Sequence, residues 1–290
     1  MSAQSSSPKH CLPRLGAAVG AAVLAVAAAQ ADTIAVIPAA DVTLISSTDG
    51  TQYALGAAYN IFCGRVGTNG EGTLRRAALR FDLSSIPAGS TITSVTFKLY
   101  MTQSTSGAQV CTMHKATESW GEGASFAFGG GGTSPEPGDA TWNYRFWPTT
   151  QWSTPGGQFV STASATKSIN GVGFWTFTST PALVADVQSW VGAPQLNYGW
   201  IVRGNEVTLE TAKKFEARES TVPERRPLLT VTYTPPPPPT PGDLNGDAVV
   251  NGADLGILLG AWGTAAPGDL NSDGTVNGAD LGLLLGYWTV

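Results

Sequence analysis

Two stretches near the C-terminal end carry the residues whose types and spacing are best suited to chemistry. Residues 243–254 read DLNGDAVVNGAD, and residues 269–280 repeat this 12-residue pattern as DLNSDGTVNGAD. An EF-hand loop supplies oxygen ligands from its positions 1, 3, 5, 7, 9 and 12, where position 7 uses its backbone carbonyl. The residues at those positions are Asp243, Asn245, Asp247, Val249, Asn251 and Asp254 in the first copy and Asp269, Asn271, Asp273, Thr275, Asn277 and Asp280 in the second.

This donor set predicts two calcium sites. Calcium is a hard cation that takes six to eight oxygen ligands, whereas zinc and copper favour the Cys and His side chains that both loops lack. The alternative is a pair of turns rich in Asp and Asn, because these residues favour turns in any protein. Two copies in the same register, each followed by a helical pattern, favour metal sites over chance turns.

Each loop leads into a short amphipathic helix. Leu255, Leu258, Leu259 and Trp262 recur at helical spacing after the first loop, and Leu281, Leu284, Leu285 and Trp288 do so after the second. One such helix cannot bury its apolar stripe alone, so we expect the two to pack together. Loop position 6 usually needs a left-handed backbone, and it holds Ala248 in the first copy but Gly274 in the second. This difference predicts that the first calcium site is the weaker one.

Residues 242–290 resemble the dockerin type I module, which consists of two such loop–helix repeats without the entering helix of a full EF-hand. The resemblance implies a secreted chain that attaches to a cohesin-like partner, often a scaffold carrying polysaccharide-degrading enzymes. The chain departs from that family at loop positions 10 and 11, where hydroxyl residues often contact the cohesin. Here those positions are Gly252-Ala253 and Gly278-Ala279.

The N-terminal end has the pattern of a secretory signal peptide. Residues 1–14 contain Lys9 and Arg14 but no acidic residue, and residues 15–29 form an apolar run. Ala29-Gln30-Ala31 fits the small-x-small cleavage rule, so we predict a signal peptide over residues 1–31. The alternative is an uncleaved anchor. No other run is long and apolar enough to span a membrane, so the sequence predicts no membrane span in the mature chain.

Composition argues for a secreted protein and against nucleic acid as a partner. The chain has 290 residues with 16 Lys+Arg and 21 Asp+Glu, and loss of residues 1–31 changes its formal charge from −5 to 14 − 21 = −7. The basic residues are scattered, so they form no electrostatic footprint for nucleic acid. Cys63 and Cys111 remain after cleavage, and an even number in an oxidising compartment favours a disulfide between them. Two buried thiols on separate strands are the alternative.

Residues 32–234 have the pattern of a mainly β domain. Apolar and polar residues alternate over 95–100, 79–81 and 229–233, and turn residues separate these runs. We therefore predict an antiparallel β-sandwich of jelly-roll or immunoglobulin-like type. Further strands are expected near 33–37, 42–46, 59–64, 109–115, 172–178 and 198–203.

One helix should interrupt these strands. Thr180 can cap it and Pro181 suits its first position. Its apolar stripe comprises Leu183, Val184, Val187, Trp190 and Val191. We expect this helix to cover an end or an edge of the sandwich. After the β domain, residues 235–241 form a proline-rich linker that should be extended and semi-rigid.

The β-rich part is also similar to DNRLRE-type domains. The resemblance rests on residues 75–89, 118–123 and 138–142, on the predicted helix and on residues 213–220, and it extends over most of 41–234. It implies a secreted, noncatalytic β-sandwich, with some relatives acting as carbohydrate-binding modules. It implies no catalytic residues.

The residues themselves offer little catalytic machinery. His114 is the single histidine after residue 31, and a structural role is the simpler interpretation. A glycosidase would need two carboxylates. Glu118, Glu122 and Asp139 are candidates from one region, for which we favour loop-ordering roles, and Glu216 and Glu219 flank Arg218, where we favour surface charges or an ion pair.

A long segment over residues 120–158 is rich in Gly, Pro and aromatic residues. A loop of this length in a compact domain is usually functional or flexible. Large aromatic side chains mostly pack inward, so the segment could build a satellite core of its own. Alternatively, exposed rings could stack on a sugar, with four candidate ligand-binding residues: Trp142, Tyr144, Trp147 and Trp152.

Together these patterns predict a secreted or cell-surface protein. Its noncatalytic β-sandwich, with carbohydrate as one candidate ligand, would be attached to a cohesin-like protein or to the cell surface by a calcium-binding tail. Two alternatives stay open. The first is a polysaccharide-degrading hydrolase or lyase that carries a dockerin. The second is a structural cell-surface protein whose tail is a calcium-locked terminal cap.

Overall fold

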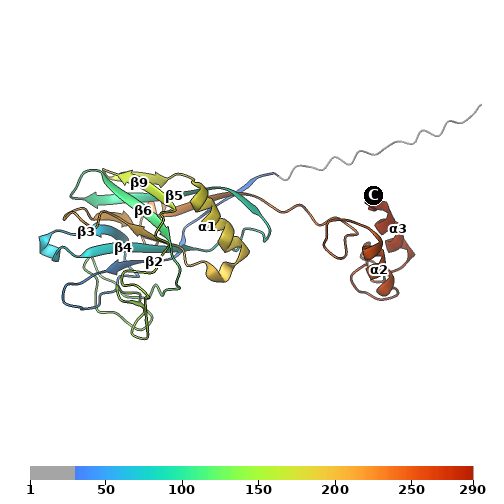
Figure 1. The fold of residues 1–290 in the computed structure, drawn as a ribbon, viewed down its shortest axis with the longest axis horizontal. Helices are drawn as coiled ribbons and strands as arrows, with labels where there is room; N and C mark the ends of the chain where they lie inside the picture. The colour runs from blue at the N-terminus through green and yellow to red at the C-terminus, as the bar shows by residue number, and fades with distance from the viewer. Residues whose placement is uncertain (1–29, 290) are drawn as a thin grey trace, which may run out of the picture.

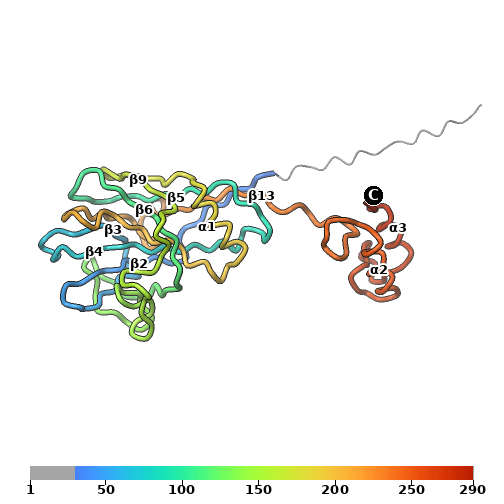
Figure 2. Tube along the Cα trace, in the orientation of Figure 1, coloured from blue at the N-terminus to red at the C-terminus, as the bar shows by residue number. Residues whose placement is uncertain are grey.

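The computed structural model describes residues 30–289, and it shows a β-rich part followed by a small two-helix module (Figure 1). The segment that joins them, residues 235–240, has no regular secondary structure. The chain trace in Figure 2 follows the connection from β13 into that segment. Most of the predicted signal peptide falls in residues 1–29 and therefore lies outside the described residues.

Thirteen strands and one helix build the β-rich part. The strands are β1 Asp32–Val36, β2 Pro38–Ile45, β3 Asn60–Arg65, β4 Leu74–Phe81, β5 Thr91–Ser104, β6 Gln109–Lys115, β7 Tyr144–Phe146, β8 Thr150–Gln151, β9 Ala165–Ile169, β10 Gly173–Phe177, β11 Trp200–Arg203, β12 Lys213–Glu216 and β13 Leu228–Thr234. All the pairings between them are antiparallel. The predicted mainly β class is therefore confirmed.

Eleven of these strands form one continuous curled sheet that folds back on itself, and β7 and β8 form a separate two-stranded sheet. The order in the large sheet is β1-β13-β5-β12-β3-β4-β11-β6-β9, with β10 added beside β5 and β2 beside β4. Strand β3 makes the turn, because residues 60–63 pair with β12 while Gly64 and Arg65 pair with β4. Gly64 has φ +108°, and a Cβ there would lie 2.9 Å from the Thr211 carbonyl oxygen, so this corner requires glycine. The arrangement is consistent with a sandwich-like fold.

The main core lies between the two halves of this curled sheet. The alternation predicted for β5 is confirmed, since Val95, Phe97 and Leu99 are buried. The strands predicted at 33–37, 42–46, 59–64, 109–115, 172–178 and 198–203 are all present within a few residues. Strands β7, β8, β9 and β12 were not predicted, because their short sequences give weak strand patterns.

The predicted helix is α1, Pro181–Gly192, and it lies at one end of the β-rich part (Figure 1). Thr180 Oγ1 accepts a hydrogen bond of 3.0 Å from the Leu183 backbone N–H, which confirms the predicted N-cap. The apolar stripe of α1 joins the main core. The Gln188 side chain ties the helix to β5, because it accepts from the Ile92 N–H at 2.8 Å and donates to the Ser90 carbonyl at 3.0 Å.

A second core lies on the outer face of β2, β4 and β11. The segment that follows β6 covers this face and buries Trp120, Ala140 and Trp152 against Val42, Leu44 and Ile201. The satellite core expected for this long segment is therefore present. It also explains why β2 and β4 are buried on both faces, unlike the alternating strand β5.

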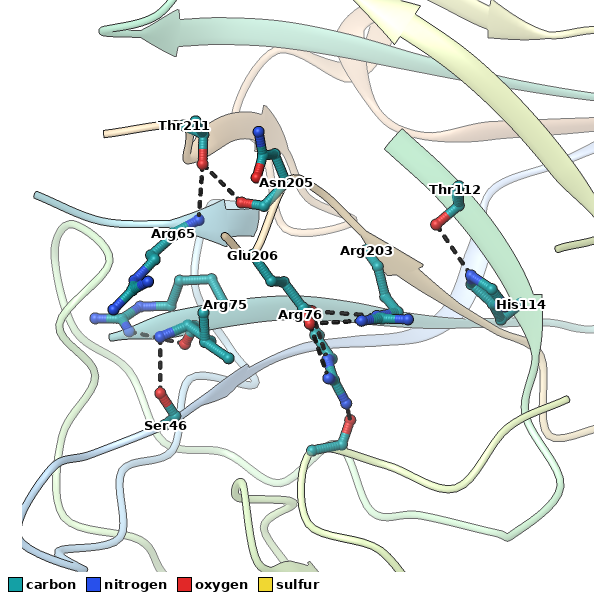
Figure 3. Close-up of polar contacts among 12 residues, drawn as sticks. Ser46, Arg65, Arg75, Arg76, Thr112, His114, Arg203, Asn205, Glu206 and Thr211 are labelled. Atoms are coloured by element: carbon teal, nitrogen blue, oxygen red, sulfur yellow. Dashed lines mark hydrogen bonds and ion pairs between the residues drawn. The ribbon is translucent and has the colours of Figure 1, made fainter. Parts of the chain in front are cut away.

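A carboxylate clamped between two arginines joins this outer layer to the sheet (Figure 3). Arg76 on β4 donates to Glu206 through Nε at 2.7 Å and Nη2 at 3.0 Å, and Arg203 on β11 donates to the same carboxylate at 3.2 and 2.6 Å. Arg76 also donates to the Gly156 carbonyl at 2.8 Å and lies over the Trp142 ring. Bidentate pairs of this kind are among the stronger polar contacts in proteins.

The C-terminal module contains α2, Gly252–Gly260, and α3, Gly278–Gly286. Val250, Leu258, Val276 and Leu284 are fully buried and form a core separate from those of the β-rich part. The predicted mutual packing of the two helices is confirmed for Leu258 and Leu284. Leu259, Trp262, Leu285 and Trp288 of the predicted stripes are exposed instead, because four residues already fill this small core.

Among the described residues, no helix is long and apolar enough to cross a membrane.

The clamp on Glu206 predicts a specific pH dependence of stability. Burial alone would raise the pKa of Glu206, but hydrogen bonds from Arg76 and Arg203 outweigh it and lower the pKa from 4.5 to about 2. The stabilisation is therefore present above pH 4.5 and is lost as the pH falls toward 2. After allowance for solvent screening, we expect it to contribute on the order of 2 kcal/mol. Glu206→Gln should cost this amount at pH 7 and progressively less below pH 4.5, as measured by denaturant unfolding.

The exposed Glu136 provides a matched control, since Glu136→Gln removes the same charge from a side chain without such a clamp. If the difference in free energy of unfolding between wild type and Glu206→Gln stays constant from pH 7 to pH 2, the lowered pKa of Glu206 is contradicted.

Candidate metal centre and ligand surfaces

The first predicted calcium loop brings its carboxylates together. Asp243, Asp247 and Asp254 each offer an oxygen, and these oxygens lie within 4.8 Å of one another. Ligands on opposite sides of a calcium ion are separated by about 4.8 Å when each lies about 2.4 Å from it. The donor set therefore fits a single calcium ion. It contains oxygen donors alone, as the sequence analysis predicted.

Hydrogen bonds to the backbone hold these side chains in place. Asp243 accepts from the N–H groups of Gly246 and Ala248 at 2.7 and 2.8 Å, which curls the loop around its first residue. Asp247 accepts from the Val249 N–H at 2.9 Å. The second loop repeats part of this pattern, with Asp269 accepting from Gly274 at 2.8 Å and Asp273 from Thr275 at 3.0 Å. Oxygens of its three aspartates do not all lie within 4.8 Å of one another, as those of the first loop do.

The last aspartate of each loop also begins the following helix. Asp254 accepts from the Asn251 N–H at 2.9 Å, and the Asn251 side chain accepts in return from the first turn, which forms a capping box. Asp254 further accepts from the Leu244 and Asn245 N–H groups at 2.8 and 3.2 Å. Asp280 has the same role with Asn277 in the second copy.

These donors keep the two buried carboxylates ionised. The hydrogen bond from the Asn251 N–H is the largest cause that lowers the pKa of Asp254, and the Asn277 N–H has the same effect on the pKa of Asp280. A carboxylate that is ionised at neutral pH is the form that binds a metal.

The structure adds a second strained position to the comparison of the two loops. Position 6 is left-handed in both, with φ +67° at Ala248 and +92° at Gly274, as expected. Position 4 is also left-handed, and there the first loop has Gly246 and the second has Ser272 at φ +59°. Each loop thus holds one non-glycine residue in a strained position. Strain at position 6 alone therefore does not rank the two loops, and the weaker first site stays a prediction.

The predicted aromatic platform over residues 142–152 is largely packed. Trp152 is buried, and its Nε1 donates to the Thr141 carbonyl at 3.0 Å, so this ring does not present a face to a ligand. Trp142 packs against the second core, with the Arg76 guanidinium 4.7 Å from the centre of its ring. Burial of Trp152 corrects its assignment to a ligand surface, whereas Trp142 is partly buried and packs mainly as a structural side chain.

Tyr144 and Trp147 remain partly exposed on the β7–β8 hairpin. Their rings meet edge to face with centroids 4.7 Å apart. The hairpin is thus the part of the predicted platform that a ligand could reach.

A second group of aromatic rings, which the sequence analysis missed, is more exposed. Tyr59, Phe126 and Phe128 form a continuous row, with ring centroids 5.4 Å apart for the first pair and 4.9 Å for the second. Phe128 is 84% exposed. We call these three residues the aromatic row. Tyr59 comes from a different loop, more than 60 residues away in sequence, and no local pattern predicts that contact.

His114 has a structural environment. Its Nδ1 lies 3.0 Å from the Val160 carbonyl oxygen and its Nε2 lies 3.0 Å from Thr112 Oγ1, as Figure 3 shows for the second contact. Burial is the main cause that lowers the pKa of His114, so the ring is neutral at pH 7. Both ring nitrogens are engaged, which leaves neither for a substrate.

The acidic residues singled out from the sequence mostly order loops. Glu118 accepts from the Ser153 N–H at 3.1 Å, and Asp139 accepts from the Glu136 N–H at 2.6 Å. Glu122 pairs with Arg218 at 2.7 Å, and Arg218 pairs with Glu219 at 2.6 Å, which is the predicted ion pair. Glu216 is buried rather than on the surface.

A cleft of about 680 Å³ lies beside α1 and is lined by Arg80, Asp82, Ser84, Gln195, Asn197 and Tyr198, among others. Asp82 is its single carboxylate. The Ser84 N–H donates to Asp82 and lowers its pKa, whereas a glycosidase acid needs a raised pKa. The cleft therefore lacks the carboxylate pair that the hydrolase alternative requires.

Cys63 and Cys111 lie side by side in the main core as two thiols, with their sulfur atoms 3.7 Å apart. The structure thus shows the proximity that the predicted disulfide needs, while the bond itself, about 2.0 Å long, is not present. The disulfide stays a prediction.

No family model matches this sequence, and no curated protein is significantly similar to it. The resemblances to dockerin type I modules and to DNRLRE-type domains therefore stay hypotheses, and the geometry described above carries the functional argument.

The shared strain of the two loops can be tested by calorimetry. Ala248→Gly and Ser272→Gly each replace a left-handed non-glycine residue, so each should tighten calcium binding by about 1 kcal/mol, or roughly fivefold. Strain at both positions predicts two sites of similar affinity in titration calorimetry of wild type, whereas strain at position 6 alone predicts a weaker first site. If Ala248→Gly tightens binding and Ser272→Gly has no effect, the first loop alone is strained and the equal ranking is wrong.

The cysteines can be tested by thiol titration of unfolded, unreduced protein that lacks residues 1–31. We expect no free thiol after expression in an oxidising compartment. Reduction should then lower the free energy of unfolding by roughly 4 kcal/mol, the chain-entropy estimate for a loop of this length. Two reactive thiols per chain would show that Cys63 and Cys111 stay reduced.

Proposed function

We propose that this protein is a secreted or cell-surface chain whose C-terminal module binds two calcium ions and attaches a noncatalytic β-rich part to a cohesin-like partner protein. The observation that carries the proposal is a duplicated surface. Both loop–helix repeats present large apolar side chains to solvent at equivalent positions: Ile257, Leu259 and Trp262 in the first repeat and Leu283, Leu285 and Trp288 in the second. Exposed apolar residues grouped in this way are typical of protein interaction sites.

The charge of the module supports the calcium requirement. Residues 242–290 contain six aspartates and no Lys or Arg. Without a cation these carboxylates repel one another across a very small core. Two calcium ions would offset four of the six negative charges, so metal binding would fix the loops and the helices that begin from them. The exposed helix faces would then be held in one arrangement.

The resemblance to dockerin modules suggests the kind of partner. A cohesin-like protein would bury the apolar side chains that the module leaves exposed. The small residues at loop positions 10 and 11 would place specificity on the helix faces rather than on hydroxyl groups in the loops. Attachment to another cell-surface component is the alternative within this proposal.

The aromatic row favours carbohydrate as the ligand of the β-rich part. Rings of this kind bury their faces against the apolar faces of sugars. Phe128 is 84% exposed, so most of its ring is open to such a contact. We favour carbohydrate binding by the aromatic row over the hydrolase alternative, because the cleft beside α1 offers Asp82 as its single carboxylate.

Attachment can be tested by binding to a panel of purified cohesin modules. Binding should occur in millimolar calcium and be lost in chelator. Trp262→Ala and Trp288→Ala should each weaken it roughly tenfold or more, since each truncation removes about 1.5–3 kcal/mol of apolar burial. Phe174→Ala is the matched control, as it removes an exposed aromatic ring from the β-rich part. Absence of binding to every module in calcium would favour the terminal-cap alternative.

Carbohydrate binding can be tested with an array of insoluble and soluble polysaccharides. Phe128→Ala should weaken retention on the bound polysaccharide roughly tenfold, with Phe174→Ala again as the control. Release of reducing ends by the wild-type protein would support the hydrolase alternative. Retention unchanged by Tyr59→Ala, Phe126→Ala and Phe128→Ala would exclude the aromatic row as the binding surface.

A further inference from the structure

Three carboxylates from distant parts of the sequence meet inside the β-rich part. Asp41 lies on β2, Glu122 lies in the long segment after β6, and Glu219 follows β12. Each offers an oxygen within 4.8 Å of those of the other two. Asp41 is only 1% exposed, and Glu122 and Glu219 are partly buried. We call these residues the Asp41 cluster.

The described neighbours supply too little positive charge for this cluster. Arg218 donates to Glu122 through Nε at 3.2 Å and Nη2 at 2.7 Å, and its Nη2 also lies 2.6 Å from Glu219. Arg226 is near enough to Glu219 to offset part of the rise that burial causes in the pKa of that carboxyl, but its guanidinium donates to the Ser220 carbonyl at 3.0 and 2.9 Å. Among the described residues, Arg218 is thus the one guanidinium that bonds directly to carboxylates of this cluster. A buried like-charge group of this kind is costly unless a cation or a proton joins it.

Two oxygens in the cluster have no hydrogen-bond partner. Asp41 Oδ2 accepts from the Arg218 N–H at 2.7 Å, but Asp41 Oδ1 is buried and unpaired. Glu219 Oε2 is also buried and unpaired. Glu122 Oε1, by contrast, accepts from the Asp41 N–H at 2.7 Å. Buried oxygens without partners are rare because each costs about 1–3 kcal/mol, so they point to a missing ligand.

We propose that the Asp41 cluster is a third calcium site, built into the β-rich part and independent of the two C-terminal loops. The donors are carboxylate oxygens, which hard cations prefer, and the cluster contains none of the Cys or His ligands that favour zinc. Oxygens within 4.8 Å of one another can all reach one calcium ion at about 2.4 Å. Asp41 Oδ1 and Glu219 Oε2 are free to bind it, while Arg218 holds the other oxygens in place.

The ion would join segments that lie far apart in the sequence. Asp41 and Glu122 are separated by 81 residues, and Asp41 and Arg218 by 177. Glu122 belongs to the segment that carries Trp120 of the second core and Phe128 of the aromatic row. Calcium at this site would therefore stabilise the outer layer of the β-rich part.

The test uses the full chain with the C-terminal loops disabled by Asp243→Ala, Asp247→Ala, Asp269→Ala and Asp273→Ala. Calcium titration by calorimetry should then detect one remaining site, and chelator should lower the melting temperature of the β-rich part. Adding Asp41→Asn or Glu219→Gln should weaken the remaining site at least tenfold. Glu224→Gln, which changes an exposed carboxylate outside the cluster, should leave it unchanged.

Two results would overturn the proposal. One is the absence of calcium binding at millimolar concentration in the loop-disabled chain, which would mean that a shared proton relieves the repulsion. The other is a remaining site whose affinity Glu219→Gln does not change. Circular dichroism checks each variant, and Glu219→Gln decides the matter if Asp41→Asn does not fold, because Glu219 is the more exposed residue. Loss of the C-terminal sites does not affect this test.

Discussion

Repulsion between carboxylates that the fold brings together is the constraint on which this structure depends. At Glu206 the cost is the burial of a single carboxylate, which two arginines offset by holding it between β4 and β11. In the first C-terminal loop, Asp243, Asp247 and Asp254 converge without a basic residue anywhere in the module. The Asp41 cluster lies between these cases, with one arginine for three acids. Calcium would balance the charges of the last two arrangements, as proposed above.

The architecture gives each of these groups a mechanical role. The curled sheet encloses the main core, and the long segment after β6 adds a second core outside it. The Glu206 clamp and the Asp41 cluster both join that outer layer to the strands. In the module, the aspartates that would bind metal also cap α2 and α3. Metal binding would therefore link helix formation to display of the apolar helix faces within 49 residues, 242–290.

The local features of the fold could be predicted from the sequence. Alternation predicted β5, the Thr180-Pro181 pair predicted the start of α1, and the duplicated loops predicted both C-terminal helices. These features depend on neighbours along the chain. The sequence also predicted that the long aromatic segment would need a core, but it did not show which rings would be buried. Trp152 is covered by the sheet, whereas Phe128 is exposed, and that difference depends on packing between distant segments.

The candidate sites also differ in whether their residues are neighbours along the chain or come from distant segments. The predicted calcium loops are contiguous, so their candidate ligands could be read from spacing alone. The left-handed backbone at position 4 was not predicted, because it is a property of the folded loop. Glu122 and Glu219 were noticed only as loop or surface charges, and Asp41 was not noticed. Nothing in the sequence shows that residues 81 and 177 positions apart meet around one carboxylate.

The most direct test of the central claim is native mass spectrometry of the full chain in calcium-containing buffer, compared with a variant carrying Asp243→Ala and Asp269→Ala. A calcium-ordered module predicts that wild type retains two more calcium ions than the variant. Equal calcium content in the two proteins would contradict it.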